Sequence, residues 1–410
     1  MLDALPLVFI LAGVVLYVVL GGADFGAGIW QMLSGPGRQG ERIREHAHHS
    51  MGPVWEANHV WLIFVITVSW TAYPTFLGSL ASTLAAAFFI AGLGIILRGA
   101  TYAMRPGLSG GRRLILLEGA FALASLVTPF ALGAAAGAIA AERVPVGNAA
   151  GNLFSSWLNP TSIVIGLLAV GFSVYLAAVY LAGDAARRGE ADLEEAFRRR
   201  ALVAGVVAGG LSLAGLIVVH ADVPSLYTGL VHGSALAVMI VSALAGVATL
   251  ALVYGRRFEI ARGSAALAVA AVISGWALAR YPMLLPGLTV QQAAAPHDAL
   301  VALVVAVIAG GILLFPALGL LFSLTLRGHL GGPEPTPPPE PATGADRPPL
   351  RDLLAPALGA RLAVALLVVG VGMLNAANAP WAHAIGVVSL FGFVIVGFAA
   401  ILPRALAADG

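Results

Sequence analysis

The chain has 410 residues, of which 59% are hydrophobic and only 10% are charged. Soluble proteins carry charge on roughly a quarter of their residues, so this composition excludes a soluble globular protein and predicts an integral membrane protein. The net charge of +2 says little, because in a membrane protein the placement of basic residues matters more than their sum. The absence of Cys excludes disulfides and thiolate metal sites.

About eleven apolar segments are long enough to cross a bilayer, which takes roughly 20 residues as a helix. In chain order they run over 5–30, 53–73, 77–103, 113–140, 160–183, 201–221, 228–254, 261–281, 298–326, 361–379 and 383–403. The first segment lacks the charged start and cleavage site of a removable signal peptide and is expected to remain as a membrane helix. The predicted fold is all-α and polytopic, with two four-helix bundles, a ninth helix and an appended helical hairpin.

The basic residues predict the orientation. All 22 are Arg, and alternate assignment of the loops leaves only Arg143 and Arg280 on one side of the membrane. By the positive-inside rule the crowded side is cytoplasmic. We therefore expect the N-terminus outside and the C-terminus in the cytoplasm.

A proline-rich stretch, GGPEPTPPPEPATGADRPP at 331–349, separates the last two segments from the rest. Proline at this density favours extended polyproline II and builds no core, so a cytoplasmic tether is expected, although a ligand for a proline-binding domain has the same composition. The predicted domains are a nine-helix membrane domain at 1–328, a linker at 329–350 and a two-helix extension at 351–410. The extension carries no ionisable group at mid-depth, which favours a packing role.

Four ionisable residues fall at similar depth in the first four segments: Asp24, Glu56, Arg98 and Glu118. A charge inside a membrane costs roughly 3 kcal/mol on insertion scales and commonly marks an ion or proton path. Neighbouring helices with short loops usually pack together, so we expect these groups to converge in one bundle. One Arg compensates about one carboxylate, and at least one carboxyl should therefore protonate easily.

Two interpretations of this cluster stay open: proton conduction, which we favour, and a buried ion-pair cluster that fixes helix register. On the second segment His59 is three residues after Glu56, so the two side chains can touch as a proton relay or as a simple hydrogen-bonded pair. The candidate proton-path residues are Glu56, Asp24, His59 and Glu118, with Arg98, Trp55, Asn58 and Trp61 in supporting positions.

Histidines elsewhere offer weaker candidate sites. His220 and His232 end one segment and open the next, and facing imidazoles could ligate a haem iron. Hydrogen bonding at the surface is the interpretation we favour, because no second His pair accompanies them. The HAHHS run at 46–50 lacks a carboxylate or thiolate complement for a metal and is expected to form a solvated turn.

Two motifs carry a family resemblance: VLGGADFGAGIW in the first segment and GPVWEANHVWLIF at the start of the second. They resemble subunit II of cytochrome bd-type terminal oxidases, with its Asp-Gly-x-Asp-x-Gly-x-Gly and Trp-acid-x-Asn-x-Val-Trp patterns. Arg98, Glu118 and the ALARYPMLLPG and HDAL runs extend the likeness over roughly residues 1–328. Gly21 departs from the first motif, where an Asp is usual, and His59 stands where an amide or acid is commoner.

The resemblance implies a haem-free subunit II without catalytic residues of its own, in a bacterial cytoplasmic (inner) membrane. Its partner would be subunit I, which carries haems b and d, oxidises quinol and reduces oxygen to water. Glu56 would be the acid of a proton path from the cytoplasm, with Asp24 nearby. Further expected partners are membrane lipid and small single-helix subunits. By analogy with related oxidases, the appended hairpin would cover the flank that such small subunits occupy.

Two other functions remain as alternatives. A proton-coupled secondary transporter would also carry membrane carboxylates, but its acids would lie near the midplane on interrupted helices of an inverted repeat. The acids here lie near one face, and no clear repeat is present. An assembly subunit without a proton role is the third interpretation. Nothing in the sequence indicates a nucleic-acid partner.

Overall fold

Helices make up nearly all regular structure in the computed structural model, which describes residues 2–51, 55–104, 112–326, 359, 361–370, 372–373 and 380–401. The predicted all-α membrane fold is confirmed. The chain divides into two compact units, Met1–Leu318 and Gly319–Gly410. The first unit contains all the candidate site residues.

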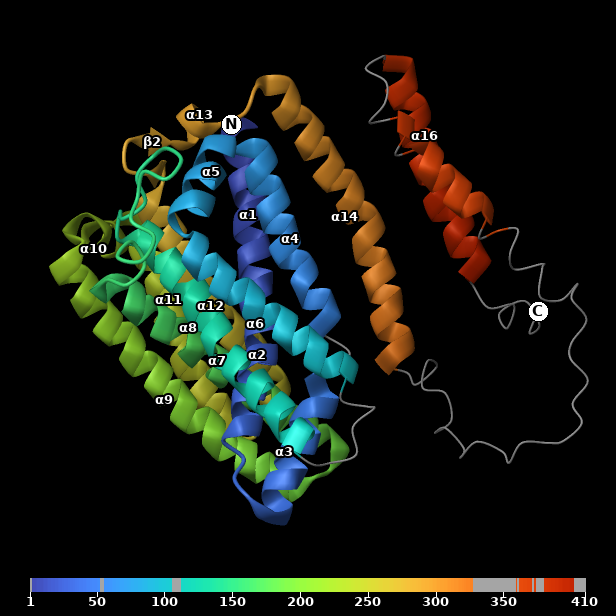
Figure 1. Cartoon of the computed structure of the whole chain (residues 1–410). Coiled ribbons are helices and arrows are strands. Elements are labelled where there is room, and N and C mark those ends of the chain that lie inside the picture. Colours follow the sequence, from blue (N-terminus) through green and yellow to red (C-terminus); the bar gives the residue numbers. More distant parts are fainter. Residues whose placement is uncertain are drawn as a thin grey trace, which may run out of the picture. The chain divides into compact units, whose positions relative to one another are not determined.

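The elements up to residue 326 are coloured in chain order in Figure 1, and residues 141–159 form a longer connection between α7 and α8. They are η1 (Leu2–Ala4), α1 (Leu5–Leu16), η2 (Tyr17–Gly21), α2 (Gly22–Met32), α3 (Gly37–Met51), α4 (Trp55–Ala72), α5 (Pro74–Thr83), α6 (Ala85–Met104), α7 (Arg112–Ala140), α8 (Pro160–Arg188), α9 (Ala191–Asp222), α10 (Pro224–Leu230), α11 (Gly233–Tyr254), α12 (Phe258–Arg280), β1 (Met283–Leu285), β2 (Leu288–Thr289), α13 (Val290–Ala293) and α14 (His297–Leu326).

Among the described residues, seven helices are long and apolar enough to cross a membrane, or up to eight if the bent pair α5 and α6 counts as one span. Three shorter apolar helices, Asn58–Ala72, Arg361–Gly370 and Ala384–Val396, fall in three further predicted segments. Each predicted segment therefore contains an apolar helix.

The third predicted segment is not one straight helix. Between α5 and α6 the axis bends by 82°. Hydroxyl groups just before the bend hydrogen-bond to nearby carbonyls: Ser79 Oγ donates to Thr75 O and Ser82 Oγ to Ser79 O. Such local bonds compete with the helical pattern and commonly accompany bends, which apolar periodicity alone does not reveal.

The seventh predicted segment, 228–254, also begins differently. The short helix α10 ends at Leu230, and α11 starts at Gly233, whose φ of +61° suits glycine.

After α12, a two-stranded antiparallel hairpin pairs Met283 with Thr289 and Leu285 with Leu288. Sequence reasoning did not predict this hairpin, because strands of three and two residues are too short to show a period.

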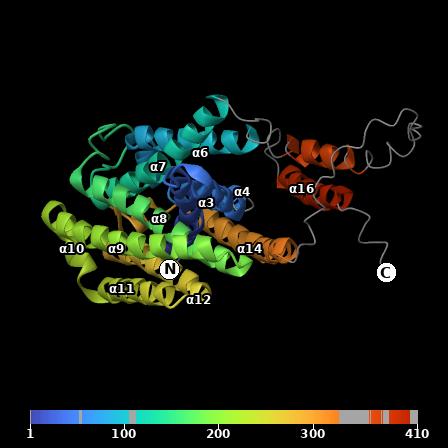
Figure 2. The same cartoon turned by 90° about the horizontal axis from the view of Figure 1, so that it is seen from below.

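The helices pack in layers. The views along and across the bundle show α6 with α7, α8 with α9, and α11 with α12 as successive pairs (Figures 1 and 2). The α1–α2 span packs against α4, α7 and α8. The core is rich in Ala, and small side chains allow the close helix approach on which membrane helix association depends.

One end of the bundle, low in Figure 1, is formed by α3, the end of α8 and the starts of α9 and α12. We call it the Arg-rich end. Ion pairs join helices there: Arg262 Nη2 lies 2.6 Å from Asp184 Oδ1, and Arg256 Nη2 lies 2.7 Å from Glu195 Oε2. The Arg256 pair is exposed and contributes roughly 0–1 kcal/mol, whereas the Arg262 pair is partly buried. Both pairs orient the helix ends.

The HAHHS run is not a solvated turn. It belongs to α3, and the His46 side chain is buried, with Nε2–H donating to Leu181 O at 3.1 Å and the ring centroid 5.6 Å from that of Phe197. Burial lowers the pKa of His46 and favours the neutral ring. The turn prediction failed because α3 packs along α8.

The second unit contains two packed helices, Arg361–Gly370 and α16 (Pro380–Ile401). A Cβ added at Gly370 would lie 2.7 Å from the Leu390 side chain, and one added at Gly392 would lie 3.3 Å from Leu366. The two glycines therefore permit close packing of this helical hairpin.

Candidate functional site

The centre of the candidate site is an ion pair between Asp24 on α2 and Arg98 on α6. Arg98 Nη2 lies 2.7 Å from Asp24 Oδ1, and both side chains are almost fully buried, at 1% and 2% exposed. Arg98 Nη2 also donates to the backbone carbonyl of Asp24 at 3.3 Å. Two charges withdrawn from solvent need such close pairing and added hydrogen bonds to offset their desolvation.

The rest of the guanidinium is held by α7 and by two aromatic rings. Arg98 Nη1 donates to Ser125 Oγ, and that hydroxyl donates to Phe121 O at 2.7 Å. The guanidinium carbon lies 4.7 Å from the ring centroid of Phe25 and 4.3 Å from that of Phe121. Ring faces attract a desolvated cation, so Phe25 and Phe121 help to stabilise the buried guanidinium.

The glycines of the first motif make room for this cluster. A Cβ on Gly28 would lie 2.2 Å from Ser125 Oγ and 2.8 Å from Arg98 Nη1. A Cβ on Gly26 would lie 1.9 Å from the Ser173 carbonyl oxygen on α8. Only glycine fits at either position without moving a neighbouring helix or the ion pair.

We expect Gly26→Ala to destabilise the subunit by about 1–3 kcal/mol or more, since overpacking against backbone is relieved only by separating α2 from α8. Gly209→Ala on α9 is the matched control, because nothing lies within 4 Å of a Cβ there. Thermal unfolding of the purified complexes, followed by tryptophan fluorescence, compares the two. Equal midpoints for the two variants would contradict the close approach of α2 and α8.

A π-helical segment, η2, interrupts the span just before Asp24. A π-turn disturbs the regular backbone hydrogen bonding and is frequent at functional sites. Asn58, buried on α4, donates from Nδ2 to the Leu20 carbonyl of this segment at 3.3 Å. The His59 ring lies edge-on to Tyr17, with 6.5 Å between the centroids. The first turns of α4 therefore pack beside η2.

The other predicted residues are placed less directly. Helix α4 begins at Trp55, so Glu56 lies in its first turn, but the side chains of Trp55 and Glu56 lie outside the described residues. Trp61 is half-buried. Glu118 lies on α7 two turns before Ser125, and its side chain is exposed in the isolated chain, unlike the buried Asp24.

His220 and His232 each have a local contact. The His220 ring lies 4.4 Å from that of Tyr227, and His232 Nδ1–H donates to Thr228 O at 2.8 Å. Both side chains are exposed. Within the described part of the chain, no three His, Asp or Glu side chains are grouped to hold a metal ion.

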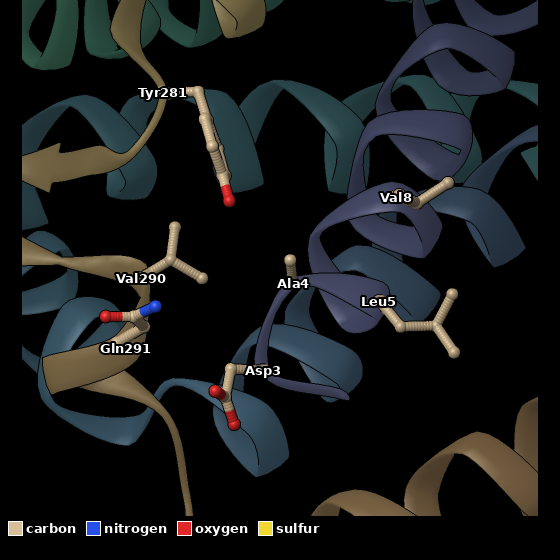
Figure 3. A pocket seen from close by; sticks show the side chains of 7 residues that line it. All are labelled: Asp3, Ala4, Leu5, Val8, Tyr281, Val290 and Gln291. Atoms are coloured by element: carbon tan, nitrogen blue, oxygen red, sulfur yellow. The ribbon is translucent and has the colours of Figure 1, made fainter. Parts of the chain in front are cut away.

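A pocket of about 370 Å³ opens at the opposite end of the first span (Figure 3). Its lining includes Asp3, Ala4, Tyr281 and Val290, and the Tyr281 ring extends into the space between α1 and the hairpin segment (Figure 3). Along a helix, Asp3 and Asp24 are separated by roughly 30 Å. The pocket therefore lies apart from the ion pair.

Sequence reasoning named Asp24 and Arg98 but missed Ser125, Phe25 and Phe121. Phe25 directly follows Asp24 in the first motif. The signal for the other two was spacing: Phe121 and Ser125 are four residues apart and so share one face of α7. Nothing in the sequence shows that this face meets Arg98.

The fold and this cluster define a polytopic helical membrane protein with a charged pair fixed in its interior. A family model described as cytochrome bd terminal oxidase subunit II matches residues 2–325. The chain belongs to this family. Among solved structures, it is similar to a chain of the bd oxidase from Geobacillus thermodenitrificans, with 26% identity, a TM-score of 0.64, and coverage of 80% of this chain and 99% of that one. A search of curated proteins found no match.

Membership confirms the resemblance carried by the two motifs. The protein is a subunit of a terminal oxidase, an oxidoreductase complex of the respiratory chain, and an integral protein of the bacterial inner membrane. The family model ends at residue 325, before the two helices of the second unit.

Proposed function

We propose that this chain is the haem-free subunit that supports a haem-bearing subunit I and admits protons to it from the cytoplasmic side. Glu56 is the acid that takes up and releases the proton, His59 is its relay partner, and Glu118 is a second acid at the same end of the bundle. Asp24 and Arg98 set the local charge. Quinol oxidation and oxygen reduction take place in the partner.

The observation that carries this proposal is the 2.7 Å pair between Arg98 and Asp24. Arg98 has one positive charge, and Asp24, held by a salt bridge inside the bundle, is the carboxylate that it compensates first. Any further carboxylate at this depth would lack a counter-charge, and protonation removes its charge at the smallest free-energy cost. In this proposal Asp24 acts as the fixed partner of Arg98, while the mobile proton belongs to another carboxyl.

The position of α4 favours Glu56 for that role. Asn58 and His59, two and three residues further on, contact the π-helical segment that leads to Asp24. The start of α4 thus lies at the junction between the Arg-rich end and the buried pair. Glu56→Gln tests the assignment, with loss of turnover but retained assembly as the expected result.

The haem-free role rests on the chemistry of the available ligands. The chain has no Cys, and among the histidines whose side chains the structure describes, His46 alone is fully buried. His46 belongs to α3 at the Arg-rich end, and its Nε2–H is bound to a carbonyl. Of the other described histidines, none offers a haem more than a partly exposed imidazole.

We therefore expect the chain expressed alone to be colourless. A pyridine haemochrome assay on the isolated subunit should detect no stoichiometric haem, with the assembled complex as the positive control. One haem per chain that disappears in His232→Ala would overturn the haem-free assignment.

A further inference from the structure

A polar pocket lies at the Arg-rich end, between the turn after α2, the start of α3 and the start of α9. Its volume is about 280 Å³, and Ser34, Gln39, Gly40 and Arg200 contribute to its lining. It is separate from the ion pair of the candidate site, because Arg98 and Asp24 are not among its lining residues.

Arg200 differs from the two arginines before it. Arg198 and Arg199 both hydrogen-bond to Glu195 at 2.9 Å through Nε. Within the described residues, the Arg200 guanidinium has neither an ion pair nor a hydrogen bond, and it stacks on the Trp30 and Phe197 rings at 5.4 and 5.3 Å. Its five N–H donors are therefore available on the edge that the rings leave open.

The surroundings of Arg200 add positive potential. The pocket includes Gln39 and Gly40 in the first turn of the 15-residue helix α3, where backbone N–H groups lack helical partners and the helix dipole favours an anion. Arg44 donates to Ser34 Oγ at 2.8 Å and so brings a second guanidinium to the pocket wall. The acid closest to Arg200 in the sequence of α9 is Glu195, which is already paired with Arg198, Arg199 and Arg256.

The pocket borders an apolar surface suited to lipid chains. Leu33 is 55% exposed beside Ser34, and Val203, one turn beyond Arg200 on α9, is 64% exposed. Trp30, whose Nε1–H donates to Val174 O, has the amphipathic ring typical of the membrane interface. The charged pocket thus lies next to exposed apolar residues, just as the charged headgroup of a phospholipid lies next to its apolar chains.

We propose that this pocket binds the phosphate group of an anionic phospholipid, with Arg200 as the principal ligand. Basic pockets between membrane helices at the cytoplasmic surface suit lipid phosphates, and the flat guanidinium fork matches their oxygen geometry. A soluble phosphate has the same chemistry at the pocket but does not use the apolar surface of Leu33 and Val203.

The test is lipid binding to the delipidated oxidase complex, followed by native mass spectrometry during titration with dioleoyl-phosphatidylglycerol. Arg200→Gln should weaken the tightest binding event by about tenfold or more, the scale of a lost charge-assisted contact. Arg199→Gln, with the same charge change one residue away and outside the pocket lining, should have little effect. Gln39→Glu places a negative charge in the pocket on an exposed residue and should also weaken binding, so the test stands even if Arg200→Gln fails to fold.

Dioleoyl-phosphatidylcholine and inorganic phosphate serve as the comparison probes. Weak binding of phosphatidylcholine and no displacement by phosphate support the anionic lipid. Displacement by inorganic phosphate would support the anion site but assign it to a soluble ligand. Equal binding of phosphatidylglycerol by the unchanged complex and by Gln39→Glu, and by Arg200→Gln where that variant folds, would overturn the proposal.

Discussion

Asp24→Asn is expected to destabilise the subunit by about 3–5 kcal/mol, the usual cost of leaving one member of a buried ion pair without its partner. The amide keeps the size of the carboxyl but carries no charge. Arg98, 1% exposed, would then keep its charge with only Ser125, a backbone carbonyl and two rings as contacts. We expect a low yield of assembled complex and a lower unfolding temperature.

The control is the double variant Asp24→Leu with Arg98→Met. Replacing both charges with apolar side chains of similar length is often neutral or stabilising, so yield should recover relative to Asp24→Asn. Turnover of the recovered complex then shows whether the fixed charge pair matters for proton transfer. Normal stability of the single variant Asp24→Asn would show that Arg98 does not depend on that carboxylate.

The membrane fold could be predicted because its signal is strong and local. Long apolar runs, such as the one that forms α8 at Pro160–Arg188, have few alternatives to a spanning helix. Interruptions were harder to predict. The π-helical segment at Tyr17–Gly21 and the bend before Ala85 lie within apolar runs, and hydropathy does not distinguish them from regular helix.

The candidate site was predicted in part for a related reason. Asp24 and Arg98 stand out because charges are rare in apolar segments, whereas Ser125 and Phe121 are ordinary residues for a membrane helix. Their contacts with Arg98 depend on how α6 and α7 pack, and one sequence does not contain that information. Glu118 shows the converse: it is as conspicuous in the sequence as Asp24, but its side chain is exposed in the isolated chain.

Glu56 carries the largest expected effect on activity. Glu56→Gln keeps the shape and most hydrogen bonding of the side chain but removes the titrating proton. Loss of one proton-transfer group commonly costs about 100-fold or more in rate. Oxygen consumption by the complex should therefore fall by about that factor, and Glu56→Asp should retain part of the rate. Glu41→Gln, an exposed acid on α3 at the same end, is the matched control and should leave turnover unchanged.

The most direct test of proton access is to measure oxygen consumption and complex yield together for Glu56→Gln, with the haem absorbance of the complex confirming that the partner is loaded. We predict a normal yield, normal haem absorbance and turnover reduced about 100-fold. A collapsed yield would assign Glu56 to structure instead. Normal yield with normal turnover would contradict the proton-path role.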